Sequence, residues 1–239
     1  MPHSCWIPLE NNPDVLNAWA AKAGLVLSSA QFGDVYGLDP ELLALVPQPV
    51  KAVILLFPIS DAIEAKRKEE DAKFLVEQQP LLDPTVLWIK QTIPNACGTI
   101  GLLHALANSD VTIMPGSPLS QFVDQCKNRS PEECAKHLET TPLFANNHAE
   151  AAYSGQTVVP NDLRTNLHFT CFVAAPSVRG PNGPGGYRVV ELDGRRIGPI
   201  DRGECIDLLS DAAKVVKNLY LAKSSGIQFS MVTLGPPRA

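Results

Sequence analysis

The sequence predicts one α/β domain of the α+β kind, with helices gathered early and a mostly antiparallel sheet toward the end. Three observations support this class. The chain has 239 residues, 45% of them hydrophobic, which is enough for one large core. Helix-capping residues recur in the first part of the chain, whereas strand-like runs joined by turn residues follow position 166. No repeat or low-complexity linker divides residues 1–239, so a single domain is expected.

Proline and capping residues mark the predicted helices. Asn12 and Pro13 predict a helix that runs to Ala23 and is closed by Gly24, because they supply an N-cap, a first-turn proline and a C-cap glycine. Similar signals predict a short helix from Pro40, a charged helix over Ser60–Gln78 whose Glu, Lys and Arg side chains face water, a buried helix over Cys97–Ala107, and a helix after the capping box Ser130-Pro131-Glu132-Glu133.

The predicted strands are apolar runs ended by proline, glycine or Asp-Gly. Residues 146–166 lack a helical or strand period and predict a long loop, which is commonly functional at this length. In order, the remaining elements are a buried strand over Val50–Phe57, strands over Leu167–Ala175 and Tyr187–Leu192 joined by a Gly/Pro-rich hairpin tip, a third strand from the Asp193-Gly194 turn toward Ile200, a helix over Asp207–Lys223, and a strand over Ile227–Leu234.

Charge and hydropathy exclude several functions. The net charge of −5 argues against sequence-independent binding of nucleic acid. The longest apolar run, Ala52–Phe57, is far shorter than the ~20 residues that cross a bilayer, and no secretory signal is visible at the start. We therefore expect a cytoplasmic protein, with nuclear entry left open. The first 120 residues carry 13 acidic and 7 basic side chains, which indicates either a solvated acidic surface or a docking face for a basic partner.

The six cysteines form no C-x-x-C pair, so neither structural zinc nor a redox pair is expected. Cys97 is the one best placed for catalysis, because it opens a predicted helix whose unpaired amides favour a thiolate. Its own amide is free to face an oxyanion, and Gln91 offers a second donor. Gly98 and Gly101 would let a substrate backbone approach. The alternative is that Cys97, like the other five, is a structural core residue.

A nucleophilic cysteine needs a histidine to move its proton and an acceptor to orient that histidine. His168 begins an apolar strand, and a strand end would hold a catalytic side chain in a fixed position. The alternative is that His168 is a core histidine with satisfied hydrogen bonds. Asp193 stands where a strand meets a turn, where Asp-Gly is also ordinary turn chemistry. The other histidines are expected in a terminus (His3), about 10 Å along the helix from Cys97 (His104), and in solvated positions (His137 and His148).

Motifs along nearly the whole chain resemble those of the ubiquitin C-terminal hydrolases, a family of cysteine deubiquitinases. The likeness is most extensive at residues 91–105, which read Gln-Thr-Ile-Pro-Asn-Ala-Cys-Gly-Thr-Ile-Gly-Leu-Leu-His-Ala. Further motifs in the family's order lie at 6–13, 31–43, 52–59, 155–157, 167–169 and 191–195. Long motifs from separate regions in a fixed order make this a specific signal.

The resemblance implies a papain-like fold with helices flanking the sheet. It implies that Cys97 is the nucleophile, that His168 is the general base and acid, and that Asp193 orients His168. Gln91 would stabilise the oxyanion together with the Cys97 amide. The implied reaction hydrolyses the bond after ubiquitin's terminal glycine through a thioester, without a metal or organic cofactor. Residues 146–166 would form a crossover loop above the cleft, which admits small or flexible leaving groups.

The resemblance also implies where ubiquitin would bind. The expected contacts are Pro8, Leu9, Glu10, Asn12, Asp34, Ser154, Gly155 and Gln156. We expect a monomer of the short, single-domain type, with a Gly/Pro-rich insertion at Arg179–Gly186 where short members have a tighter hairpin. Two alternatives stay open: a hydrolase that prefers a ubiquitin-like modifier such as Nedd8, and a non-catalytic ubiquitin-binding protein.

Overall fold

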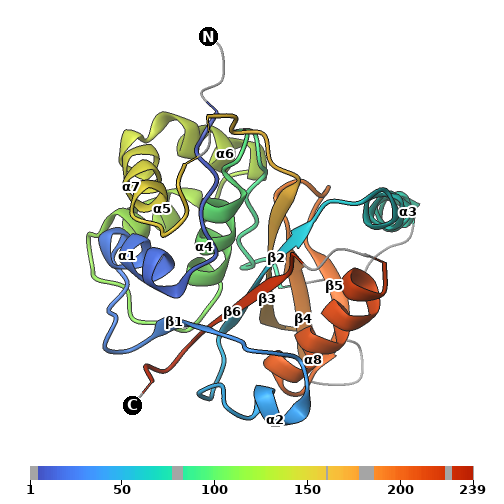
Figure 1. The fold of residues 1–239 in the computed structure, drawn as a ribbon. Helices are drawn as coiled ribbons and strands as arrows, with labels where there is room; N and C mark the ends of the chain where they lie inside the picture. The colour runs from blue at the N-terminus through green and yellow to red at the C-terminus, as the bar shows by residue number, and fades with distance from the viewer. Residues whose placement is uncertain (1–4, 77–82, 160, 178–185, 224–227, 239) are drawn as a thin grey trace.

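The computed structural model describes residues 5–76, 83–159, 161–177, 186–223 and 228–238, which form a six-stranded antiparallel sheet between two groups of helices (Figure 1). The strand order is β1-β6-β2-β3-β4-β5, so β6 is inserted between the first two strands of the chain. The strands are β1 (Gln31–Asp34), β2 (Ala52–Pro58), β3 (Leu167–Pro176), β4 (Tyr187–Leu192), β5 (Ile200–Cys205) and β6 (Ser230–Gly235).

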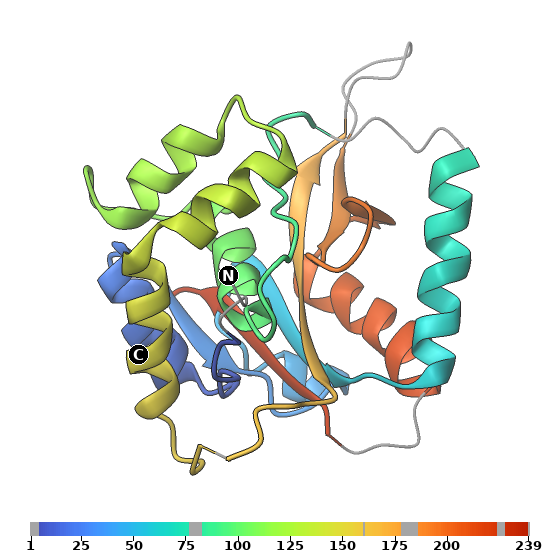
Figure 2. The same ribbon diagram turned by 90° about the horizontal axis from the view of Figure 1, so that it is seen from above.

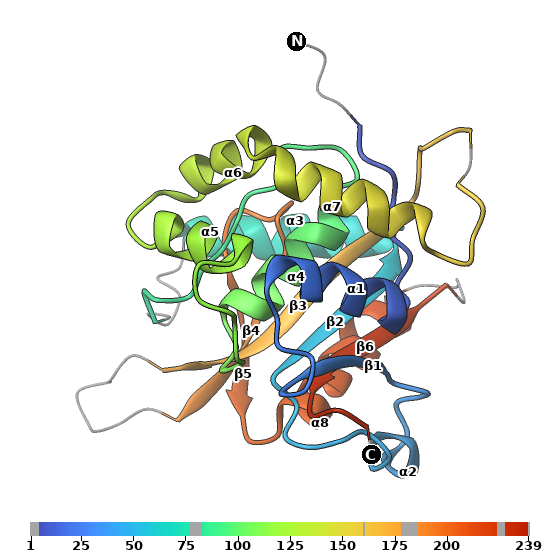
Figure 3. The same ribbon diagram turned by 90° about the vertical axis from the view of Figure 1, so that its left-hand side faces the viewer.

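The helices cover both faces of the sheet, as Figure 2 shows from above. The helices are α1 (Pro13–Ala23), α2 (Pro40–Leu43), α3 (Asp61–Val76), α4 (Cys97–Ala107), α5 (Pro118–Cys126), α6 (Pro131–Thr140), α7 (Pro142–Tyr153) and α8 (Leu208–Val215). Helices α1 and α4–α7 lie on one face, and α3 and α8 lie on the other (Figure 3). None of these helices is long and apolar enough to cross a membrane.

Alternation along the strands divides the core into two. On β2, Ala52 and Ile54 pack with the α4 side of the sheet, whereas Val53, Leu55 and Phe57 pack with the α8 side. Successive side chains of a strand point to opposite faces, so a strand covered on both faces is apolar throughout. This explains why Ala52–Phe57 is the longest apolar run of the chain.

Local signals predicted several elements well. Asn12 caps α1 by accepting the Asp14 amide, and Gly24 closes the helix with φ 120°. Helix α4 has the predicted bounds. The capping box at Ser130 is present, with both reciprocal hydrogen bonds to Glu133. The predicted papain-like arrangement of an antiparallel sheet between helices is confirmed.

Other expectations need correction. The long loop begins at Ser154 rather than 146, because α7 extends to Tyr153. The helix expected to reach Lys223 is α-helical only to Val215, and then continues as a π-helical turn over Val216–Tyr220 and a 3-10 turn over Leu221–Lys223. The third strand begins at Ile200 rather than approaching it from the Asp193-Gly194 turn.

Strand β1 and helices α5 and α7 were not predicted, and the predicted helices were placed too exclusively before the sheet. Strands β1 and β2 precede most helices, and each pairs with β6 near residue 230. The Arg179–Gly186 insertion, the helix end at Gln78, the strand start at Ile227 and His3 fall on or overlap positions outside the described residues.

Candidate active site

Cys97 is the first residue of α4, and its side chain is nearly buried, with 8% of the residue exposed. The preceding Asn95 has φ 63°, a left-handed conformation that asparagine tolerates, and it turns the chain sharply into the helix. The first amides of a helix have no partner within the helix. The Cys97 amide is therefore directed to the same end of α4 as its thiol. At that end it could donate a hydrogen bond to an oxyanion.

His168, at the start of β3, faces this thiol. Helix α4 packs against β3. A Cβ on Gly101 would lie 3.8 Å from Phe169 Cβ, which is an ordinary van der Waals contact. The Cys97 side chain lies close enough to the His168 ring to help raise the pKa of that ring. The Nε2 of His168 is 2.7 Å from Asp193 Oδ1, which leaves Nδ1 for the thiol. The edge-on ring of Phe57 on β2, at 5.6 Å between ring centroids, closes the other side of the imidazole.

Asp193 directly follows β4 and is 1% exposed. Its Oδ1 also accepts the Arg195 amide at 2.8 Å, so the carboxylate both shapes the Asp-Gly turn and holds His168. Its Oδ2 pairs with the Arg67 guanidinium. Burial acts to raise the pKa of Asp193, but the charges of His168 and Arg67 outweigh it and hold that pKa below its ordinary range.

These contacts set the protonation of His168. Burial acts to lower the pKa of the ring, but the Asp193 charge and the Cys97 side chain outweigh it and raise the pKa to about 9. The imidazolium is therefore the favoured form at neutral pH. A charged ring beside a thiol is the arrangement that stabilises a thiolate.

Gln91 lies in an extended segment that docks against the Asp193 turn. Its backbone amide donates to the Gly194 carbonyl at 2.8 Å, and the Trp88 Nε1–H donates to the Asp193 carbonyl at 3.0 Å. The Gln91 Nε2 donates to the Ile93 carbonyl at 3.2 Å. Since an amide nitrogen carries two hydrogens, one remains for an oxyanion. A Cβ on Gly194 would come within 3.0 Å of the Gln91 amide nitrogen, so glycine is required for this approach.

Two histidines near the site are structural. His104 is fully buried: its Nε2 accepts the Ile89 amide at 2.9 Å, and its Nδ1 lies 3.2 Å from the Leu192 carbonyl. His104 thus joins the Gln91 segment to the end of β4. His148, expected in a solvated loop, is instead buried in α7, where Nδ1 bonds Thr99 at 2.8 Å. Burial lowers the pKa of each ring to about 4, so both are neutral.

The predicted cysteine placement is correct in part. Cys126, Cys134 and Cys171 are buried free thiols, as expected of core residues. Cys5 is exposed and Cys205 is half-buried, so neither is a core residue. Gly98 does not open the helix to a substrate, since a Cβ there would meet Leu9 at 3.0 Å.

Glu10 fastens the segment after α7 rather than projecting into solvent. Its Oε2 accepts the Thr157 amide at 3.0 Å, and its Oε1 accepts the Asn12 side chain at 3.2 Å. Further along, the Leu163 carbonyl accepts the Asn95 side-chain amide at 2.8 Å. Thr157 and Leu163 are therefore both held in place, and Leu163 is held next to the nucleophile turn.

The other predicted ubiquitin contacts differ in accessibility. Leu9 is buried in the core, with 5% of the residue exposed. Ser154 and Gln156 are exposed, whereas Pro8, Asn12, Asp34 and Gly155 are half-buried. A Cβ on Gly155 would lie 2.6 Å from Glu10 Oε2, so this glycine permits the Glu10 clamp.

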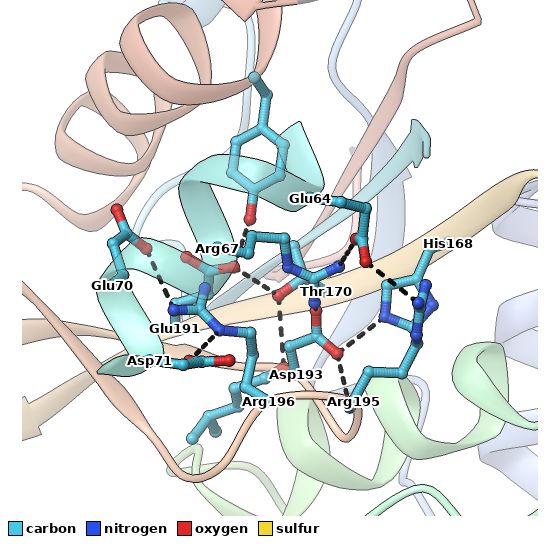
Figure 4. Close-up of polar contacts among 12 residues, drawn as sticks. Glu64, Arg67, Glu70, Asp71, His168, Thr170, Glu191, Asp193, Arg195 and Arg196 are labelled. Atoms are coloured by element: carbon cyan, nitrogen blue, oxygen red, sulfur yellow. Dashed lines mark hydrogen bonds and ion pairs between the residues drawn. The ribbon is translucent and has the colours of Figure 1, made fainter. Parts of the chain in front are cut away.

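A cluster of buried charges lies behind the site and was not expected from the sequence (Figure 4). Glu191 accepts from Tyr220 and, at 3.1 Å, from Thr170, and it pairs with Arg202 at 2.6 Å. Helix α3 joins this cluster through Arg67 and Glu70, so its charged side chains do not all face water as predicted. Among the residues described, no group of three or more His, Cys, Asp or Glu side chains could hold a metal ion.

The sequence is similar to proteins of one family over most of its length. The model of ubiquitin carboxyl-terminal hydrolase, family 1, matches residues 6–220. Ubiquitin carboxyl-terminal hydrolase 3 of Arabidopsis thaliana is 39% identical over 233 residues, covering 96% of this chain and 93% of that protein. The isozyme L1 of Rattus norvegicus is 37% identical over 231 residues, covering 95% of this chain and 96% of that protein.

The fold is also similar to solved structures. The Trichinella spiralis UCH37 catalytic domain bound to ubiquitin vinyl methyl ester superposes with a TM-score of 0.73 at 20% identity. The match covers 98% of this chain and 97% of that one. At this identity, the likeness establishes the fold.

Proposed function

Because the chain belongs to ubiquitin carboxyl-terminal hydrolase family 1, we propose that Cys97, His168, Asp193 and Gln91 carry its reaction. The protein is a thiol-dependent ubiquitin hydrolase, and ubiquitin is its substrate. The observation that carries the residue assignment is the His168 ring, whose Nε2 lies 2.7 Å from Asp193 Oδ1 and whose pKa is raised by both Asp193 and the nearby Cys97 side chain.

In the first half of the reaction, the Cys97 thiolate attacks the carbonyl carbon after which ubiquitin is cut. The carbonyl oxygen becomes an oxyanion, which the Cys97 amide and the free Gln91 Nε2 hydrogen stabilise. The C–N bond then breaks, and the His168 imidazolium gives its proton to the leaving nitrogen. The product is a thioester between Cys97 and the terminal glycine of ubiquitin.

In the second half, neutral His168 takes a proton from water as the water oxygen attacks the thioester carbonyl. The C–S bond breaks, ubiquitin leaves as a carboxylic acid that loses its proton to solvent, and the thiolate–imidazolium pair is restored. Asp193 keeps the ring oriented through both halves, because Nε2 stays bound to Oδ1 while Nδ1 exchanges the proton.

The segment over 154–166 is the proposed crossover loop that limits the leaving group. It is anchored at one end by Glu10 and near the other by Asn95, the residue two positions before the nucleophile. A loop tied to the nucleophile turn admits an adduct or a flexible peptide and obstructs a large folded conjugate. Exposed Ser154 and Gln156, with half-buried Asp34, remain the proposed contacts for the basic tail of ubiquitin.

Hydrolysis of a fluorogenic ubiquitin C-terminal amide tests the assignment of the nucleophile. Cys97→Ala should abolish turnover, whereas Cys205→Ala, which changes a half-buried thiol outside the site, should keep it. Turnover by the Cys97→Ala protein would refute the assignment. Tight ubiquitin binding by the wild type without turnover would favour the non-catalytic alternative.

Competition between electrophilic ubiquitin and Nedd8 probes for Cys97 tests the choice of modifier. We propose ubiquitin as the preferred one, so the ubiquitin probe should label Cys97 first when both are present in equal amounts. Preferential labelling by the Nedd8 probe would reverse that order.

A further inference from the structure

Arg67 is a buried arginine that reaches the active site from α3, which covers the face of the sheet opposite α4. It lies on α3, and only 6% of the residue is exposed. One guanidinium nitrogen pairs with Asp193 Oδ2, and another donates to Glu64 at 2.8 Å (Figure 4). The guanidinium also lies over the Phe57 ring, 5.7 Å from its centroid, and Phe57 in turn contacts His168.

The two oxygens of Asp193 are therefore divided between two partners. Oδ1 binds His168 Nε2 and the Arg195 amide, and Oδ2 binds Arg67. A carboxylate held at both oxygens cannot rotate about its terminal bond without breaking one of these contacts. The charged or titratable groups facing this carboxylate or its two partners are Glu64 and Arg67 from α3, Cys97 and His104 from α4, His168 from β3, Glu191 and Arg195 from β4 and its turn, and Tyr220 from the π-helical turn.

We propose that Arg67 is a positioning residue of the catalytic centre: by holding Asp193 Oδ2, it directs Oδ1 at His168 and supplies a positive charge to the triad. This inference rests on the proposed roles of Cys97, His168 and Asp193. Through the ion pair between Arg67 and Asp193, α3 becomes part of the active site.

The charge of Arg67 separates this role from simple packing. A nearby cation disfavours the protonated form of every neighbouring group. Replacing it with the neutral side chain of Arg67→Met should therefore raise the pKa of His168. The limb of the Cys97 alkylation profile that follows His168 ionisation should move to higher pH by about one unit, the size that a single neighbouring charge produces at a buried site.

The experiment measures alkylation of Cys97 by iodoacetamide as a function of pH, with the modified Cys97 peptide quantified by mass spectrometry. Alkylation needs no ubiquitin, so its result is independent of substrate identity. The matched control is Arg202→Met. Arg202 is also a buried arginine, pairing with Glu191 at 2.6 Å and Glu70 at 3.0 Å, and it contacts no member of the triad.

We expect the limb of the Cys97 alkylation profile to move to higher pH in Arg67→Met. In Arg202→Met and Arg67→Lys, it should stay within a few tenths of a pH unit of its position in the wild type. Coincident limbs for Arg67→Met and wild type would overturn the proposal, and so would an equal shift in Arg202→Met. A wild type with this limb but no hydrolysis of the ubiquitin amide would instead count against the proposed function.

If Arg67→Met does not fold, the variants Arg67→Lys and Arg202→Lys still test the proposal. A single ammonium cannot reach both Glu64 and Asp193 as the planar guanidinium does. Arg67→Lys should therefore lower kcat for the ubiquitin amide at least about tenfold with little change in KM, since small misplacements of catalytic groups have effects of this size. Arg202→Lys should keep kcat close to that of the wild type. Equal kcat values in the two variants would overturn the proposal.

Discussion

Mild acid should destabilise this protein largely through two histidines that are far from exposed. His104 and His148 are buried, and burial lowers the pKa of each from an ordinary 6.5 to about 4. Protonation of His104 would remove the acceptor of the Ile89 amide. Both rings are therefore neutral in the folded protein and become charged on unfolding as the pH falls below 6.5.

The size of the effect follows from these pKa values. When folding lowers the pKa of a histidine from 6.5 to about 4, the free energy of unfolding of the protein decreases by about 3 kcal/mol as the pH is lowered through that interval. Two such residues together account for about 6 kcal/mol, comparable with the total stability of a small domain, roughly 5–15 kcal/mol. His168 acts in the opposite direction: its pKa is raised to about 9, so its contribution is complete below 6.5 and is lost as the pH rises through 9.

The assay is equilibrium unfolding in urea between pH 4.5 and 7.5, which gives the slope of the free energy of unfolding against pH. In this interval each histidine should contribute up to about 1.4 kcal/mol per pH unit. His104→Gln and His148→Gln should each lower the slope by about one proton, whereas His137→Gln, at a half-buried position where burial also lowers the pKa, should lower it less. Slopes equal to that of the wild type in both buried variants would refute the reasoning.

Three further experiments test the geometry of the site. Gly194→Ala should lower kcat for the ubiquitin amide at least about tenfold, because its Cβ would press on the Gln91 backbone amide and displace the side-chain oxyanion donor of Gln91. Unchanged kcat would show that Gln91 is not held there. Glu10→Gln should speed hydrolysis of ubiquitin carrying a bulky leaving group relative to a small one, because the Thr157 amide loses its charged acceptor, and a constant ratio would argue against the clamp. At pH ~6, iodoacetamide should modify Cys97 faster than exposed Cys5, since reactivity follows thiolate population rather than exposure, and mass spectrometry of the two peptides distinguishes the cases.

Local chemistry predicted those elements whose signals lie within a few residues. Helix α4 and the caps of α1 and α6 depend on side chains that bond neighbouring amides, so the sequence alone contains their cause. The same applies to Cys97, whose position at a helix start is visible in its own segment. His168 and Asp193 were identified as candidates from strand ends, and the structure brings them within 2.7 Å of each other.

The errors arose where distant parts of the chain decide the outcome. In α7, Asn147 and His148 look like loop residues, but Asn147 donates to the Trp19 carbonyl and His148 bonds Thr99. Arg67 has the local sequence of a solvated helix, yet its partner Asp193 lies more than a hundred residues away. No pattern near Arg67 contains that partner, so it could not be predicted from one sequence.

The place of β6 in the sheet sets an order of events during protein synthesis. Gln31 on β1 pairs with Gly235, and Ala52 on β2 pairs with Leu234, so residues 230–235 must emerge from the ribosome before β1 has a neighbour and before β2, which can pair with β3 earlier, gains its second one. Pairing between segments so distant in sequence makes folding slow, because the chain entropy is lost before the contacts form. We therefore expect the nascent hydrolase to remain unable to process ubiquitin until residues 230–235 have been translated.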